Sequence, residues 1–264
     1  MRFILALLLG GVVATFAAHA NAQEIDWQKV DAAFGRKPAV SGDVHRYGFP
    51  RTDLQVSVDG VTIKPALALG GWVAMKPVQG GALAMGDLVV LETEINPVMS
   101  KLLEGGVDIS AVHNHLLRSS PATFYMHIGS HGDPVKMANA IHAALAASKT
   151  PLEAPAASPS TPAVDLDTGQ LEQIIGAKGQ ANGGVYQFAV PRRDPIMEHG
   201  ASLVPPGPTG VATGINFQPS GSGKAAITGD FVLIGEEVNP GDQGIADERY
   251  RGHGDPQPHA DRAA

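Results

Sequence analysis

Apolar residues recur along the chain with two periods, and each period predicts one kind of element. Alternation at every second residue is typical of strands, and spacing of three or four residues is typical of helices. The pattern predicts helices over 27–34, 96–104 and 135–148, and strands over 43–49, 53–63, 70–77, 81–92, 107–117 and 122–130. The β-α-β-β-α order after residue 82 favours an α+β fold, in which two helices cover one face of a mainly antiparallel sheet.

Local signals set the ends of several of these elements. The Asp-Gly pair at 59–60 is typical of a tight hairpin turn. Asn96-Pro97 and Asp133-Pro134 each combine a good N-cap residue with proline at the first helical position. We therefore expect one helix to begin at Pro97 and another at Pro134.

The chain repeats itself. Residues 34–53 align without a gap with residues 175–194 at an offset of 141, and residues 86–97 align with residues 229–240 at an offset of 143. Repeats of this length are duplicated domains rather than solenoid units. We predict two tandem copies of the α+β unit, and we predict that the second is incomplete because the likeness stops after Pro240.

A segment rich in proline, alanine and serine at residues 149–164 separates the two copies and is typical of an extended linker. The predicted domains are therefore residues 23–148 and residues 165–264, the second aberrant after residue 240. If the tail 241–264 is read one nucleotide out of frame, permitted codons give a segment that aligns with residues 98–120, including the letters HNH. We hypothesise that an extra nucleotide near the codon of Pro240 shifted the frame. The alternative is a divergent tail.

The N-terminus has the pattern of a secretory signal peptide over residues 1–22. Arg2 precedes an apolar run from Phe3 to Ala18, and small residues follow up to Ala22. The run is too short to predict a membrane span, and the mature chain has no other candidate for a transmembrane segment. No cysteine follows the run, which excludes a lipoprotein anchor. We expect an exported protein, periplasmic or secreted, that begins at Gln23.

The composition of the chain limits the metal ligands and the partners that it can have. The chain has no cysteine, so it has neither a disulfide nor a thiolate ligand, and any metal site must use histidine and carboxylate side chains. The formal net charge is −7 and no basic stripe with interleaved aromatic residues is present, which argues against a nucleic-acid partner. The tripeptide His113-Asn114-His115 is not the signature of an HNH nuclease, in which the three residues are spread over a ββα unit.

Three histidines form the main candidate site. Residues two apart on a strand point to the same face, so His113 and His115 are expected to project together while Asn114 projects away. If the next strand pairs with theirs, His127 lies beside them, within reach of a shared ion. Glu92 and Glu94, just upstream, are the candidates for a carboxylate ligand or a general base. Such a set suits Zn, Mn, Fe or Cu.

Two alternatives to a metal remain open for these histidines. They can line a site for a small organic molecule, or they can be structural.

Two other motifs occur in both copies. Arg51 and Asp53 in the first copy match Arg192 and Asp194 in the second, and each pair either binds an anion or forms a structural ion pair, which we favour. The Gly-Asp pairs at 86–87 and 229–230 are interpreted as tight turns that lead into a buried strand.

The run GDLVVLETEINPVMSKLLEGGVDISAVHNHLL, followed by FYMHIGSHGDPVKMANAIHAAL, resembles the LppY/LpqO family, also called DUF1259. The resemblance covers nearly all of residues 27–240. It implies an exported bacterial protein with two copies of this unit, and it implies no particular reaction. Family members usually carry a complete second copy with its own HNH segment, from which this chain departs after Pro240.

Three functions are compatible with the sequence. The first is an exported binding or sensing protein that holds a divalent metal ion or a small ligand at the histidines. The second is a metal-dependent hydrolase or lyase with Glu92 or Glu94 as the base. The third is a non-catalytic structural module of the cell envelope.

Overall fold

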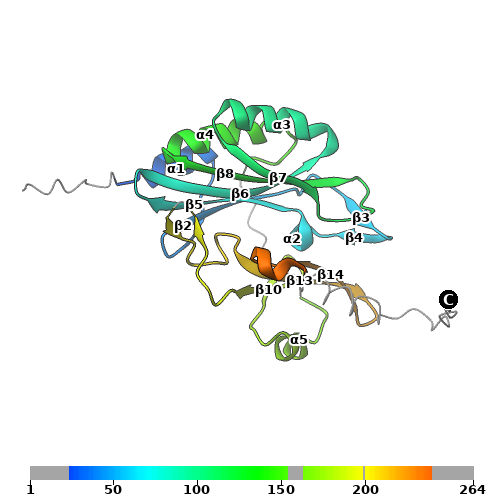
Figure 1. Ribbon diagram of the computed structural model, residues 1–264. Helices are drawn as coiled ribbons and strands as arrows, with labels where there is room; N and C mark the ends of the chain where they lie inside the picture. The colour runs from blue at the N-terminus through cyan, green and yellow to red at the C-terminus, as the bar shows by residue number, and fades with distance from the viewer. Residues whose placement is uncertain (1–23, 154–162, 199, 240–264) are drawn as a thin grey trace, which may run out of the picture.

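The computed structural model describes residues 24–153, 163–198 and 200–239. These residues form four layers: a layer of helices, a sheet, a second sheet, and one further helix on the outside of the second sheet (Figure 1). The predicted signal peptide, residues 154–162 of the predicted linker and the tail 241–264 lie outside the described residues.

The first repeat is built on one sheet. Its strands in chain order are β1 (Ala39–Ser41), β2 (Val44–Pro50), β5 (Gly70–Val78), β6 (Gly81–Leu91), β7 (Asp108–Asn114) and β8 (Thr123–Gly132). Across the sheet they lie in the order β1-β2-β5-β6-β8-β7. Every neighbouring pair is antiparallel, which confirms the predicted sheet type.

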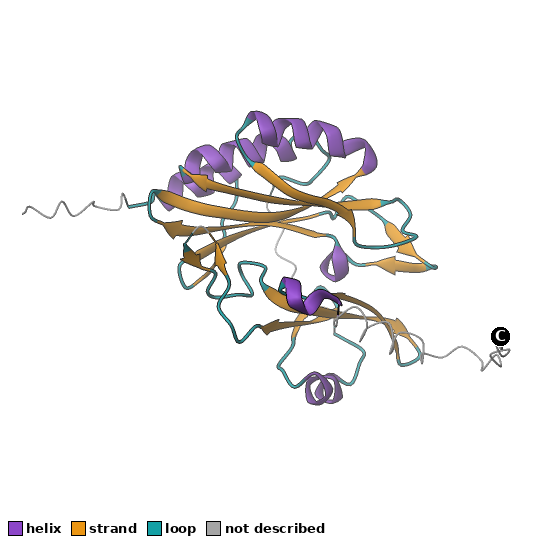
Figure 2. Cartoon of the chain, in the orientation of Figure 1, coloured by secondary structure: helices purple, strands orange, loops and turns teal. Residues whose placement is uncertain are grey.

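Helices α1 (Trp27–Phe34), α3 (Glu92–Glu104) and α4 (Pro134–Leu145) all cover the same face of this sheet (Figure 2). The main core lies between these helices and the sheet, where Leu88 and Met126 from the strands pack with Val98 and Ile141 from the helices. Burial of this apolar surface is the main stabilising term of the first repeat. In the described ranges, no helix has both the length and the apolar character needed to cross a membrane.

The predicted ends of two helices are confirmed. The carboxylate of Asp133 accepts the backbone N–H groups of Val135 and Lys136, which caps α4 as the sequence indicates. Helix α1 ends at Gly35, whose φ of 67° is a left-handed conformation that glycine adopts without strain.

The predicted start of α3 is wrong by about one turn. The helix begins at Glu92 and runs through Asn96 and Pro97 instead of starting there. Glu94 is the reason, because its carboxylate folds back and accepts the backbone N–H of Leu91 at 2.8 Å. This contact caps the helix ahead of the Asn-Pro signal.

The predicted turn at Gly86-Asp87 is also wrong, because both residues lie inside β6, paired with β5 on one side and β8 on the other. A Cβ atom on Gly86 would lie 2.8 Å from the carbonyl oxygen of Trp72 and 3.0 Å from Cγ1 of Ile128. Glycine is therefore needed here for a close approach of strands rather than for a turn.

Short elements lie against the other face of the first sheet. They are β3 (Val56–Val58), β4 (Val61–Ile63) and α2 (Pro65–Ala68). The hairpin between β3 and β4 turns at Asp59 and Gly60, both with positive φ, as predicted.

The second repeat reproduces the first half of this unit. Its elements are α5 (Thr168–Ile175), β9 (Gln180–Asn182), β10 (Val185–Pro191), β11 (Met197–Glu198), β12 (Ala201–Ser202), β13 (Ala212–Gly221), β14 (Lys224–Asp230) and the 3₁₀ turn Gly235–Glu237. Strands β14-β13-β10-β9 lie in the same order as β6-β5-β2-β1, and α5 corresponds to α1. Among the described residues, β7, β8 and α4 have no counterparts in this repeat, so the second copy is incomplete.

The two repeats are joined through α2 and the segment before it. Gln218, which is buried, donates to the carbonyl of Thr62 at 2.7 Å and accepts the backbone N–H of Lys64 at 2.8 Å. Gln187 donates to the carbonyl of Ala66 at 2.7 Å, and Asn216 donates to that of Leu67 at 3.3 Å. The second sheet is thus held facing the open side of the first.

Candidate functional site

The histidines of the first repeat lie where that open side of the sheet meets the second repeat. Strands β7 and β8 pair antiparallel, which confirms the predicted pairing, and they place His113 diagonally across from His127. The Nε2 atoms of these two rings are 2.9 Å apart. His115 follows the last residue of β7, with its ring centroid 6.4 Å from that of His113.

The ring of Tyr125 packs against the rings of His113 and His115. Its ring is buried and lies 5.9 Å from the His113 ring and 4.8 Å from the His115 ring, centroid to centroid. Its hydroxyl donates to the carbonyl of Ala68, the last residue of α2. Because the tyrosine is fixed at both ends, it limits the positions that the two imidazoles can take.

Two aspartates complete the cluster, one from each repeat. Asp87 on β6 is the register partner of His127, and its Oδ1 atom lies 3.9 Å from Nε2 of that histidine. Asp230 at the end of β14 lies 3.3 Å from Nδ1 of His115. The two aspartates occupy equivalent positions in the two copies, so the duplication supplies one carboxylate from each side.

Asp87 is half-buried, and one of its two carboxyl oxygens has no hydrogen bond. Its Oδ1 atom is shielded from solvent and makes no hydrogen bond. Burial raises the pKa of this carboxyl to about 6, although His113 and His115 oppose the rise. Burial also lowers the pKa of His127, and the neighbouring His113 lowers it further. A half-buried carboxyl with one unbonded oxygen, beside imidazole rings, is typical of a site for a cation or a polar ligand.

A pocket of about 610 Å³ opens beside the cluster, between the two sheets. Arg46 lies 3.7 Å above the ring of Trp72 and donates to the carbonyl of Pro208 at 2.6 Å. Burial lowers the pKa of Arg46 to about 10, against the effect of Asp87, so the guanidinium is charged at neutral pH. Side-chain amides of the second repeat (Asn182, Gln187 and Asn216) complete the polar lining.

The structure separates the two candidate glutamates from this cluster. Glu92 is exposed in the first turn of α3. Glu94 is buried and bound to Arg51, so its carboxylate is already used as a partner in an ion pair. Within the described residues, no three side chains of histidine, aspartate or glutamate are arranged around one point in a way that could hold a metal ion. The closest donor pair is His113 with His127.

A scan against family models matches the family described as Domain of Unknown Function (DUF1259) twice, over residues 28–147 and 169–248. The chain belongs to the DUF1259 family. No curated protein and no solved structure matches the chain. The second DUF1259 match is shorter than the first, in agreement with the incomplete second repeat, and it extends past Pro240 into the tail.

Each DUF1259 unit of this chain contains the same ion pair. In the first, Arg51 donates to Glu94 at 2.7 Å and to the carbonyl of Val89 at 2.9 Å. In the second, Arg192 donates to Glu237 at 2.5 Å and to the carbonyl of Val232 at 3.0 Å. This geometry fits the favoured interpretation, in which each arginine forms a structural ion pair, and in each copy a glutamate is a partner in addition to the predicted aspartate. The signal was present in the sequence, because both glutamates recur at the offset of 143.

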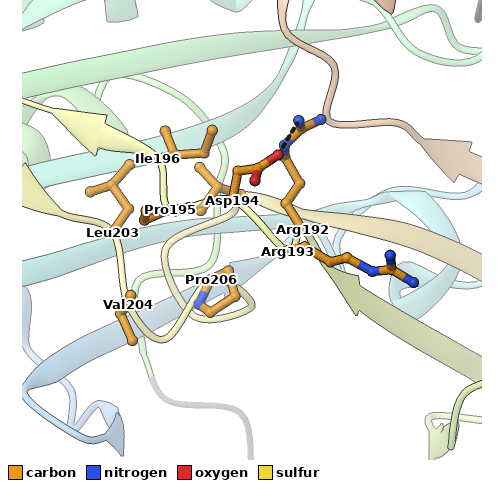
Figure 3. Close-up of a pocket in the computed structure, with 9 residues that line it drawn as sticks. Arg192, Arg193, Asp194, Pro195, Ile196, Leu203, Val204 and Pro206 are labelled. Atoms are coloured by element: carbon orange, nitrogen blue, oxygen red, sulfur yellow. Dashed lines mark ion pairs between the residues drawn. The ribbon is translucent and has the colours of Figure 1, made fainter.

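The aspartates of the same motif differ between the two copies in how closely they contact the arginine. Asp53 receives two hydrogen bonds of 2.9 Å from Arg51. Asp194 lies 3.6 Å from Arg192 and is largely exposed. Figure 3 shows that Arg192 and Asp194 point toward one another at the edge of a small cavity of about 140 Å³, while Arg193 extends away. The opposite wall of that cavity is apolar (Ile196, Leu203 and Val204), which does not suit a bound anion.

Proposed function

We propose that this protein binds a divalent metal ion at His113 and His127, with Asp87 as the carboxylate ligand. The supporting observation is that two Nε2 atoms face one another at 2.9 Å beside a buried carboxylate oxygen that has no partner. Two imidazoles and one carboxylate are a donor set that Zn, Mn, Fe or Cu accepts. The donor types therefore fit such an ion, and because Oδ1 of Asp87 lies 3.9 Å from Nε2 of His127, the three side chains would have to move together to hold it. When bound, the ion would act as a Lewis acid toward a ligand in the pocket.

The neighbouring pocket supports a second component of this function, the binding of a small polar organic molecule. Arg46 offers a positive group, Asp230 a negative one, and Asn182 and Asn216 offer amides. A pocket of this size and lining suits a small molecule that carries both donors and acceptors. His115 and Asp230 line this pocket and contact each other beside the proposed metal ligands, so they would contact the bound molecule.

Metal analysis tests the proposal. Purified protein, stripped with chelator and titrated calorimetrically with Zn, Mn, Fe or Cu, is expected to take up about one ion per chain. Affinity is expected to fall as the pH drops through about 6.5, because protons compete for imidazole nitrogen. Absence of uptake for all four ions would contradict metal binding and favour the purely structural alternative.

A metal-dependent hydrolase or lyase is the second candidate, and the raised pKa of Asp87 is the observation that favours it. A carboxyl with a pKa of about 6 is suited to accept a proton near neutral pH, as a general base does. Asp87→Asn separates the two roles. If Asp87 is a ligand, the substitution weakens metal binding, whereas if Asp87 is a base, the metal stays bound and any turnover is lost.

We also propose that the protein is exported, on the pattern of Arg2 and the apolar run that follows it. Expression of the full chain in a bacterium with an intact export system is expected to give a soluble form that begins at Gln23, as read by N-terminal sequencing. Replacing Ala20 and Ala22 by leucine should block this cleavage. Recovery of the full-length chain from the cytosol, uncleaved in both forms, would contradict export.

A further inference from the structure

The outer surface of the second repeat carries apolar side chains whose equivalents in the first repeat are core. Ala84, Leu88 and Val90 are at most 1% exposed, beneath α3 and α4. The residues at the same positions in the second copy are Ile227, Phe231 and Leu233, which are 60%, 51% and 36% exposed. Exposed apolar groups of this size, at alternate positions of one segment, are typical of an interaction surface.

Among the described strands, β14, which carries Ile227, is also unpaired on one side. Strand β6 of the first repeat is paired along its length, with β5 on one side and β8 on the other. Its equivalent, β14, is the terminal strand of its sheet and pairs with β13 alone among the described strands. A free strand edge beside an apolar face is a template for pairing with another strand.

The residues of β14 fit a second copy of the same strand. Ile227 is the middle residue of the seven in β14, so antiparallel pairing of two β14 strands across a twofold axis places Ile227 against itself. The same register places Lys224 of one chain opposite Asp230 of the other, which is a favourable charge pair.

We propose that two copies of this chain associate through β14, joining their second sheets into one continuous antiparallel sheet. The association covers Ile227 and removes the free edge.

The chain has no cysteine, which allows a direct test in the full mature protein. In Ile227→Cys, two thiols lie opposite each other at the twofold axis, so mild oxidation is expected to convert most of the protein to a covalent dimer. Leu103→Cys is the matched control, because Leu103 is 57% exposed on α3 of the first repeat, away from the edge. It is expected to form no covalent dimer on the same timescale.

Light scattering after size exclusion gives an independent measurement. The wild type is expected to show twice the monomer mass at micromolar concentration, and Ile227→Lys is expected to show the monomer mass with an unchanged circular dichroism spectrum. A monomeric wild type at every concentration would overturn the proposal, as would equally fast cross-linking of the Leu103→Cys control.

Discussion

Replacing Arg51 by alanine is expected to lower the free energy of unfolding by about 3–5 kcal/mol, because it breaks a buried ion pair on one side only. The guanidinium of Arg51 is completely buried, and Glu94 is 6% exposed. Burial alone would lower the pKa of Arg51 and raise that of Glu94, but hydrogen bonds more than offset both effects. Arg51 donates to Asp53 as well as to Glu94, and Glu94 also accepts the backbone N–H groups of Leu91 and Lys149. Without the arginine, Glu94 would be a buried charge with no counterion.

The second repeat provides the matched control for this variant. Arg192→Ala removes the equivalent guanidinium, but Glu237 is 41% exposed in its side chain and can be solvated by water. We therefore expect a clearly smaller loss of stability. Denaturant unfolding of the two variants measures the difference, and equal losses would contradict the assignment of Arg51 as the buried anchor of the first repeat.

The pH dependence gives a further check on the same ion pair. The pKa of Glu94 is lowered in the folded protein, so its stabilising contribution is present above the ordinary carboxyl pKa and is lost as pH falls through the lowered value. The difference in stability between the wild type and Arg51→Ala should accordingly narrow in acid. A gap that stays constant down to low pH would argue against Glu94 as the residue left unpaired.

His113→Ala and His127→Ala are each expected to weaken divalent-metal binding by about 100-fold or more. Removal of even an outer-shell partner of a metal ligand lowers metal affinity by about 10–100-fold, and these residues are proposed as the ligands themselves. Both variants should keep the fold, since neither ring belongs to the main core cluster. His115→Ala should have a smaller effect, because its ring faces Asp230. Calorimetric titration, with circular dichroism as the folding control, measures these differences.

Two substitutions serve as controls for the metal series. Asn114 lies between His113 and His115, on the opposite face of the strand, and Asn114→Ala removes its side chain. His142→Ala removes an imidazole from α4. Both should bind metal like the wild type. If Asn114→Ala loses the ion while His127→Ala retains it, the site lies elsewhere.

Much of the first repeat could be predicted from local signals. The cap at Asp133 and the left-handed Gly35 depend on a few neighbouring residues, and both were found where the sequence placed them. The start of α3 could not be predicted in this way. It depends on Glu94, whose carboxylate is held by Arg51 from 43 residues earlier in the chain.

The candidate site likewise has residues that the sequence could predict and residues that it could not. Period-two alternation and a short turn were enough to bring His113 and His127 to one place. The prediction of a turn at Asp87 was wrong, because a Gly-Asp pair has the same sequence inside a strand as in a turn. Asp230 and the amides of the pocket come from the second repeat, and no local pattern indicates how two sheets will face one another.

The side-chain amides that join the repeats bind main-chain atoms of the first repeat at residues 62, 64, 66 and 67. A main-chain carbonyl or N–H is the same whatever side chain is attached to it. Thr62 and Ala66 can therefore diverge in evolution without loss of these bonds, whereas Gln187, Asn216 and Gln218 cannot. Lys64 and Leu67 are restricted by their own side chains, since Lys64 donates to the carbonyl of Gly184 and Leu67 is buried. Tolerance to substitution at this junction should be wide at Thr62 and Ala66 and narrow at the three amide residues.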